Sequence, residues 1–333
     1  MTRGLHTQKI DDSLLASAIS GADRIISTDD RQFLKNVESL IVYLHGQILF
    51  EKYYNGYKKD SLHQIQSQTK SIIALLMGIA IDKGFIRDEN EKVSHFFPAC
   101  FNESDPLKSS VTIRDLLTMS AGFKWEEMLA FDDPGNDNTN MFRSSHWLNY
   151  AISRPVVRKP FTEFKYNSGC PMIVAGIIEK ATGMKLDDFA DKYLFKPLKI
   201  TRYNWIRDSS GFCHAGGGLF LSPLDMLKIG ILVMNKGKWE DKQLVSERWI
   251  NKVTSPYIKT QVDTSSYGFF WWIREMKLKD NRTVIVTTAE GAGGQKLFLF
   301  PEYGLIIAFT EHNYTTAQVS AVFITESILP VLE

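Results

Sequence analysis

The sequence predicts an α+β fold in which an antiparallel β-sheet is flanked by helices and carries an inserted, mostly helical lobe. Strand patterns occur at both ends of the chain, helical patterns fill the middle, and one apolar helix begins near residue 67. If the terminal strands form one sheet, the helical stretch is an insertion between two halves that are distant in sequence. We expect a sheet lobe of residues 1–90 and 254–333, a helical lobe of residues 91–253, and an active site in the cleft between them.

The ends of the chain supply the expected sheet and its outer helices. Residues 10–26 have the spacing of an amphipathic helix, and residues 40–44 and 47–54 are typical of two strands around a tight turn. A closing helix is expected from about residue 316 to 332. Four further strands are predicted at residues 269–273, 284–287, 296–300 and 305–310.

The middle of the chain is mostly helical. Residues 112–117, 171–181 and 223–234 have helical spacing, and Gly183 is placed to stop the second of these helices. Residues 72–81 are apolar on every side, which is typical of a buried helix. This run is too short to cross a bilayer.

Composition limits the possible partners. The 333 residues are 44% hydrophobic and carry a formal net charge of +1, so we expect neither a nucleic acid nor an anionic membrane as partner. The three cysteines, Cys100, Cys170 and Cys213, fit no disulfide scaffold or zinc pattern and are expected to be small buried hydrophobes. The oligomeric state stays open.

The start of the chain, residues 1–6, has no apolar stretch of the kind found in secretory signals. We therefore expect a cytoplasmic protein, or a periplasmic or secreted one if a leader has been removed.

The seven histidines form no His-Glu-x-x-His pair, so no metal is expected, and His63 is expected to have a structural packing role.

Ser67 and Lys70 are the first candidate catalytic residues. They lie one helical turn apart where the buried helix begins. Poor solvation would lower the pKa of the lysine toward that of a general base. The alternative is a plain N-cap serine, but a capping box would need Glu or Gln at position 70, and a lysine there opposes the helix dipole.

Two further stretches could complete the site. Tyr166 precedes a helix of the middle region, and beside a lysine its pKa would fall, making it a base for water or an acid for a leaving group. A core or loop aromatic is the alternative. The glycines of residues 290–295 permit a ligand to approach the backbone closely, unless the segment is only a hairpin turn.

These motifs come in an order that resembles the penicillin-recognising serine hydrolases. Ser67-x-x-Lys70 is followed by Tyr166 and then by a glycine turn that leads into a late strand. The chain is similar to the class C β-lactamase branch, which includes esterases, D-amino-acid peptidases and nylon-oligomer hydrolases. Residues 112–122, 215–219 and 293–295 support the resemblance.

The resemblance implies a role for each motif. Ser67 would be the acylated nucleophile, Lys70 its proton partner and Tyr166 the second acid/base, without any cofactor. The backbone N–H groups of Ser67 and Ala292 would form the oxyanion hole. The substrate-binding positions would be Ser168, Glu290, Gly291 and Gly293.

Two departures from the lactamase pattern weaken the case for a β-lactamase. Ser168 stands where Tyr-x-Asn has its asparagine, and residues 289–291 read Ala-Glu-Gly in place of Lys-Thr-Gly. An anionic substrate loses an attractive lysine and meets Glu290 instead. We therefore expect a serine hydrolase that acts on a small ester or amide and has weak or no β-lactamase activity.

Some alternatives stay open. The protein could be a D-specific peptidase or transacylase, or a non-catalytic sensor that binds acyl compounds on the same fold. Residues 128–145 either rim the cleft or form a solvated loop. Strand alternation allows at most one of Trp271 and Trp272 to wall the pocket.

Overall fold

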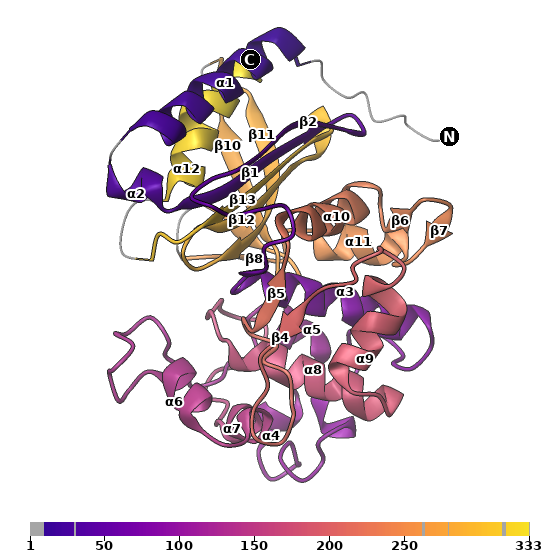
Figure 1. Ribbon diagram of the computed structural model, residues 1–333. Helices are drawn as coiled ribbons and strands as arrows, with labels where there is room; N and C mark the ends of the chain where they lie inside the picture. Colours follow the sequence, from indigo (N-terminus) through magenta and orange to yellow (C-terminus); the bar gives the residue numbers. More distant parts are fainter. Residues whose placement is uncertain (1–9, 30, 262–263, 279, 315–317, 333) are drawn as a thin grey trace.

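The computed structural model describes residues 10–29, 31–261, 264–278, 280–314 and 318–332 and is organised around one large antiparallel sheet (Figure 1). In this part of the chain the sheet has eight strands in the order β2-β1-β13-β12-β11-β10-β9-β8. The first strands of the chain thus lie beside the last, which confirms the predicted α+β fold. The bounds are β1 Val37–Leu44, β2 Gln47–Tyr53, β8 Ile258–Lys259, β9 Ser266–Tyr267, β10 Trp272–Lys277, β11 Thr283–Gly291, β12 Gln295–Phe300 and β13 Leu305–Glu311.

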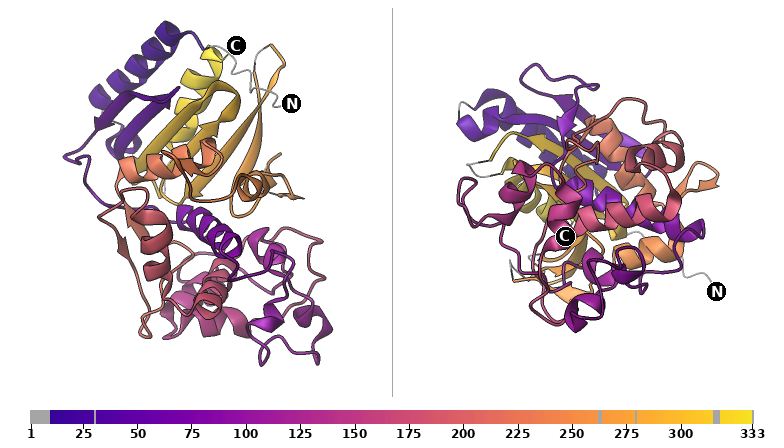
Figure 2. Two further views of the ribbon diagram at one scale, coloured as in Figure 1. Left: turned by 90° about the vertical axis from the view of Figure 1, so that its right-hand side faces the viewer. Right: turned by 90° about the horizontal axis from the view of Figure 1, so that it is seen from below.

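The outer face of the sheet is covered by helices from the two ends of the chain. α1 (Asp12–Thr28) and α12 (Val319–Phe323) lie side by side over it (Figures 1 and 2). Because side chains alternate along a strand, Leu40 and Val42 pack toward these helices, whereas Ile41 between them packs into the core on the other face. Both faces of β1 are therefore buried.

The inner face is covered by α10 (Pro223–Met234), which contacts β12 and β13. Gly230 allows this close approach, because a Cβ at this position would lie 3.1 to 3.2 Å from Leu297, Leu299 and Ile306. Although α10 belongs to the stretch expected in the helical lobe, it packs on the sheet. The division of the chain into a sheet lobe and a helical lobe, with boundaries at residues 90 and 253, stays a prediction.

α3 (Gln68–Asp82) forms the centre of the molecule. It contacts β11 on one side and α8 (Gly169–Thr182) on the other, and its residues 68–80 are all buried. The indole of Trp249 donates to the carbonyl of Ala74 at 2.9 Å. The remaining α-helices are α2 Gln32–Lys35, α4 Pro106–Ser109, α5 Ile113–Leu117, α6 Asp137–Arg143, α7 Trp147–Ser153, α9 Leu186–Ala190 and α11 Glu247–Val253.

Short strands complete the architecture. β3 (His63–Gln64), β5 (Leu219–Leu221) and β4 (Asn204–Trp205) form a small sheet, and β6 (Lys238–Trp239) pairs with β7 (Lys242–Gln243). The β3–β5 pairing fixes the chain that leads into α3 against the segment that precedes α10. Strands of two or three residues are too short to produce a sequence pattern, and none of them was predicted.

Two predicted elements differ from the structure. The strand expected at residues 269–273 begins only at Trp272, because Gly268 N–H donates to the carbonyl of Trp271 at 2.8 Å and Phe270 has a φ of 58°, which together form a turn. The closing helix is α-helical only in α12. It continues as a π-helical turn (Ile324–Ile328) and a 3-10 turn (Leu329–Val331), and residues 316–317 of the predicted helix lie outside the described residues.

Candidate active site

Ser67 occupies the N-cap position of α3, but its side chain does not cap the helix. Its backbone is already helical (φ −64°, ψ −8°), and no backbone N–H donates to its hydroxyl. Instead, Lys70 Nζ donates to Ser67 Oγ at 2.7 Å. The plain N-cap alternative therefore does not describe this serine.

Lys70 is buried, with 1% of its surface exposed. Besides Ser67, its ammonium donates to the carbonyl oxygen of Gly216 at 2.5 Å and lies 5.0 Å from the centre of the Tyr166 ring. Burial lowers the pKa of Lys70 to about 8, against the opposing influence of the Glu127 carboxylate. The expectation of a lysine with a lowered pKa is confirmed.

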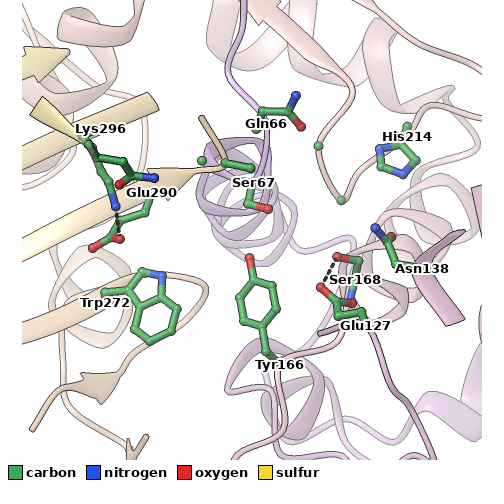
Figure 3. A pocket seen from close by; sticks show the side chains of 15 residues that line it. Gln66, Ser67, Glu127, Asn138, Tyr166, Ser168, His214, Trp272, Glu290 and Lys296 are labelled. Atoms are coloured by element: carbon green, nitrogen blue, oxygen red, sulfur yellow. Dashed lines mark hydrogen bonds and ion pairs between the residues drawn. The ribbon is translucent and has the colours of Figure 1, made fainter. Parts of the chain in front are cut away.

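Tyr166 points its hydroxyl toward Ser67 (Figure 3). The expected fall in its pKa is wrong. Desolvation raises the pKa of Tyr166 well above its ordinary value, the Glu127 carboxylate raises it further, and a hydrogen bond with Ser67 opposes both. Tyr166 is therefore a neutral phenol near neutral pH.

The glycine turn between β11 and β12 lies against the chain that leads to Ser67. A Cβ at Gly291 would be 2.3 Å from the carbonyl oxygen of Ile65, so only glycine fits at this crossing. Ala292 follows at the tip of the turn, and both Ala292 and Ser67 line the same cavity. The structure thus brings the two proposed oxyanion-hole residues to one place.

A cavity of about 370 Å³ lies between the sheet and the helices beneath it, and Figure 3 shows the side chains that line it. This volume is in the range of small-molecule sites. Of the predicted site residues, Lys70 and Gly293 are not among the residues that line the cavity, and the others line it. The lining residues are Gln66, Ser67, Glu127, Asn138, Tyr166, Ser168, His214, Gly216, Gly217, Trp272, Glu290, Gly291, Ala292, Lys296 and Gln318.

Ser168 lines the helical side of the cavity and is held by Glu127. Its backbone N–H donates to Glu127 Oε2 at 2.6 Å, and its Oγ donates to Oε1 at 3.0 Å. Trp125 Nε1 also donates to Oε2, at 2.6 Å. Glu127 was not predicted as a site residue, because nothing in the pattern around it separates it from its neighbour Glu126.

Glu290 lies on the sheet side, and its charge is compensated. Arg274 contacts one carboxylate oxygen at 2.8 Å, Lys296 pairs with the other, and Thr288 donates at 2.7 Å. Burial opposes ionisation, but Lys296 and Arg274 lower the pKa of Glu290 overall. With two cations around one carboxylate, the expected repulsion of an anion by Glu290 is not supported.

Of the other lining residues, Trp272 and the segment that holds Asn138 were open alternatives, whereas His214 was not predicted. Trp272 lines the cavity and stacks on Tyr166, with ring centres 6.0 Å apart. Trp271 is fully buried, so only one of the two tryptophans lines the pocket, as strand alternation allowed. Asn138 comes from the 128–145 segment, which thus reaches the cavity, although its residues 137–143 form the helix α6. Burial and the nearby Lys70 lower the pKa of His214 to about 4, so this ring is neutral near neutral pH.

The described residues offer no evident metal site. They contain no group of three or more His, Cys, Asp and Glu side chains able to hold a metal ion. Among the helices of the same part of the chain, none is both long and apolar enough to cross a membrane.

The α+β fold, with a serine–lysine pair at the start of a buried helix beside the cavity, defines a protein of the serine β-lactamase and penicillin-binding-protein superfamily. A family model described as Beta-lactamase matches residues 38–322. The chain belongs to this family.

Named relatives are hydrolases. A 6-aminohexanoate-dimer hydrolase from Paenarthrobacter ureafaciens is 24% identical over 306 residues, which cover 86% of this chain and 75% of that protein. The structure of EstCE1, described as a hydrolase with promiscuous acyltransferase activity, has a TM-score of 0.77 at 14% identity and covers 96% of this chain and 99% of its own. A D-stereospecific amidohydrolase from a Streptomyces species has a TM-score of 0.71 at 14% identity and covers 96% and 98%. The protein is thus an enzyme of a hydrolase family.

Proposed function

We propose that this enzyme is a serine hydrolase that forms an acyl-enzyme at Ser67 and hydrolyses small esters or amides. The observation that carries the proposal is the 2.7 Å contact between Ser67 Oγ and the Nζ of buried Lys70, whose pKa is lowered to about 8. At pH 7 roughly a tenth of such lysines is unprotonated, against a negligible fraction for an exposed lysine. The unprotonated amine is the base that a serine nucleophile needs.

The proposed reaction begins with proton transfer from Ser67 to neutral Lys70 as Oγ bonds to the substrate carbonyl carbon. The backbone N–H groups of Ser67 and Ala292 stabilise the oxyanion. Tyr166, a neutral phenol, donates its proton to the leaving oxygen or nitrogen as the scissile bond breaks. The proton held by Lys70 then restores Tyr166. Water attacks the acyl group, releases the acid and returns a proton to Ser67.

Relatives support an amide substrate as well as an ester. One relative is named for the hydrolysis of a 6-aminohexanoate dimer, and one structural neighbour is named a D-stereospecific amidohydrolase. The alternatives are a D-specific peptidase or a transacylase at the same serine. A non-catalytic acyl-binding sensor is disfavoured, because a sensor has no need of a lysine with a lowered pKa beside a serine.

β-Lactamase activity is expected to be weak or absent. The lysine of Lys-Thr-Gly is replaced by Ala289, and the cations that remain nearby, Lys296 and Arg274, are engaged with Glu290. A lactam carboxylate would have to compete with Glu290 for them. Efficient turnover of nitrocefin would contradict this expectation.

Covalent labelling tests the nucleophile. A fluorophosphonate probe should label the enzyme, and peptide mapping should place the label on Ser67. Ser67→Ala should abolish labelling, whereas Ser110→Ala, at an exposed serine that does not line the cavity, should retain it. Labelling that persists in Ser67→Ala would move the nucleophile elsewhere.

A substrate panel then separates the reaction types. p-Nitrophenyl esters, D-alanyl amides and nitrocefin should be compared, with and without an added amine or alcohol acceptor. Fast release of nitrophenol alone indicates an esterase, and stereoselective cleavage of the amides indicates the peptidase. Transfer to the added acceptor indicates a transacylase. Stoichiometric labelling without turnover of any substrate would support the sensor.

A further inference from the structure

The glycine turn between β11 and β12 carries Ala292, the second proposed donor of the oxyanion hole. β13 lies between β1 and β12 in the sheet (Figure 1), but its pairing with β12 reaches only as far as Lys296 and Phe309, and the turn extends beyond this pair. On one side, at Gly291, the turn packs against the chain that leads to Ser67. The contacts on its other side therefore help to set the position of Ala292.

Glu311, the last residue of β13, supports that other side. A Cβ at Gly294 would lie 2.6 Å from the carboxyl carbon of Glu311, so only glycine fits against this side chain. Gln295 Nε2 donates to the backbone carbonyl of Glu311. Two residues further on, the N–H of Asn313 donates to the carbonyl of Gly293 at 2.8 Å. The turn is thus packed between the chain that leads into α3 and the end of β13.

The Glu311 side chain is fully buried and is held by three N–H donors. Its Oε2 accepts from Asn313 Nδ2 at 2.7 Å and from the Val319 N–H at 2.9 Å. Its Oε1 accepts from the Ser320 N–H at 2.7 Å. Among the described residues, it forms no ion pair. Burial raises the pKa of the Glu311 carboxyl, and the hydrogen bonds oppose this rise.

The same side chain also fixes a second segment that reaches the cavity. Gln318 lines the cavity and is the N-cap residue of α12, directly before Val319, whose N–H donates to Glu311. One buried carboxyl therefore contacts both the glycine turn with Ala292 and the start of α12. Burying a carboxyl costs free energy, and such a cost is expected where function needs a fixed geometry. The alternative is that Glu311 serves only to anchor the start of α12.

We propose that Glu311 is a positioning residue that holds the glycine turn, and through it the Ala292 N–H, in the place that the oxyanion requires. Oxyanion donors act only within a narrow range of distance and direction, so a side chain that fixes the turn contributes to the rate without touching the substrate. This inference rests on the proposed function, because Ala292 is an oxyanion donor only in that reaction.

Glu311→Gln tests the proposal by separating kcat from KM. An amide accepts through its oxygen alone, so at least one of the three N–H donors loses its partner. The loss of an oxyanion donor costs about 10²- to 10³-fold in kcat, and a displaced donor should cost less, about 10- to 100-fold. Because the oxyanion forms in both acylation and deacylation, KM for a p-nitrophenyl ester should change by less than about threefold.

A tetrahedral adduct gives a second readout of the same geometry. Hexyl trifluoromethyl ketone adds to a serine nucleophile and places an oxyanion in the oxyanion hole. Its affinity for Glu311→Gln should fall by about the same factor as kcat/KM.

Asp115→Asn is the matched control. Asp115 is also a buried carboxyl whose pKa is raised by burial, and it accepts from the N–H and the hydroxyl of Thr112 at the start of α5. It does not line the cavity. Like Glu311→Gln, this variant should unfold at a lower urea concentration than the wild type, but it should keep both kcat and the ketone affinity. A merely structural role of Glu311 would make the two variants alike.

Gln295→Met is a milder variant that decides the question if Glu311→Gln does not fold. It removes the donor to the Glu311 carbonyl, together with Gln295 Oε1, a buried atom without a hydrogen bond among the described residues. The fold should therefore tolerate it. We expect kcat to fall by about 3- to 10-fold with little change in KM, because the turn loses one of its supports.

The outcomes separate this inference from the proposed function. A lower kcat and a weaker ketone affinity in Glu311→Gln, or in Gln295→Met where the first variant does not fold, support the positioning role if Asp115→Asn stays active. An unchanged kcat in the folded variant, or an equal loss in Asp115→Asn, would overturn it and leave the proposed function standing. A wild type that neither hydrolyses esters nor reacts with the fluorophosphonate probe would overturn the proposed function, and the positioning role with it.

Discussion

Among the described α-helices whose N-cap residue is Ser, Thr, Asp or Asn, the helix begins in one of two ways, and the difference depends on whether the N-cap residue lines the cavity. Where the N-cap residue is Ser, Thr, Asp or Asn and lies away from the cavity, its side chain accepts a hydrogen bond from the first helical turn, as at Thr112, Ser222 and Ser246. Ser67 and Ser168 also occupy N-cap positions, but neither side chain caps its helix, and both line the cavity. Both have helical backbone angles.

This contrast shows how the backbone at a helix start decides whether a serine hydroxyl caps the helix or stays available for other contacts. A capping serine holds its oxygen against the backbone, where it stabilises the helix by about 1 kcal/mol. When the N-cap residue is itself helical, its side chain points away from the helix end. Ser67 then contacts Lys70, and Ser168 contacts Glu127. The uncapped helix ends forgo stability at places where a function is proposed.

Alanine at the two kinds of serine should have opposite effects, and this is the largest difference we expect. Ser67→Ala should reduce ester hydrolysis by about 10⁴-fold or more. Because no cap is lost and only the bond from Lys70 is removed, the free energy of unfolding should fall by less than about 1 kcal/mol. Ser222→Ala should retain activity and lose about 1 kcal/mol of stability, because its hydroxyl accepts from the Asp225 N–H. Both variants should be compared by enzyme kinetics and by urea denaturation. A lower free energy of unfolding for Ser67→Ala than for Ser222→Ala would contradict the prediction.

Lys70→Met should also lower activity strongly, by about 10²- to 10⁴-fold, because the base is lost. It should at the same time raise the free energy of unfolding by about 1 to 3 kcal/mol, since an apolar side chain replaces a buried amine. Lys108→Met is the matched control. Lys108 is also buried, and its Nζ donates to the carbonyl of Ile152 at 2.7 Å away from the cavity lining, so the activity of this variant should not change.

The pH dependence sharpens the same contrast. The kcat/KM for a neutral ester should rise with pH and level off above about 8, where Lys70 loses its proton, and Lys108→Met should keep this profile. In the stability measurement, the unfolded chain holds the lysine proton up to its ordinary pKa near ~10.4, whereas the folded state releases it near 8. The unfolding free energy of the wild type should therefore rise relative to Lys70→Met between pH 8 and 10. A flat difference over this range would contradict a lowered pKa.

The sequence predicted the parts of the fold that carry strong periodic signals. Residues 223–234 were expected as a helix and form α10 with the same bounds, and the strands near residues 40, 47, 284, 296 and 305 were all found. The turn at Phe270 was missed, because a positive φ at a phenylalanine has no sequence signature. The end of the chain has the pattern of one helix, but only five residues of it form α12.

The residues of the candidate site could be predicted only where they lie close together in the sequence. Ser67 and Lys70 are one turn apart on one helix, so sequence alone could pair them. Glu127 meets Ser168 across 41 residues, a contact that no local pattern encodes. The direction of the Tyr166 pKa was mistaken for a similar reason, because desolvation depends on residues such as Trp272 that pack on it from another element.

Ser168→Ala should have the smallest effect, and this result decides what the second uncapped serine does. The substitution removes the 3.0 Å bond from Oγ to Glu127 but keeps the 2.6 Å bond from the backbone N–H, so Glu127 stays in place. We expect a loss of about 0.5 to 1 kcal/mol in stability and a rise in KM of less than about tenfold, with kcat nearly unchanged. If kcat instead fell by about 100-fold or more, Ser168 would carry a proton in the reaction. The two uncapped serines would then share one chemical role, whereas we propose that Ser67 reacts and Ser168 positions Glu127.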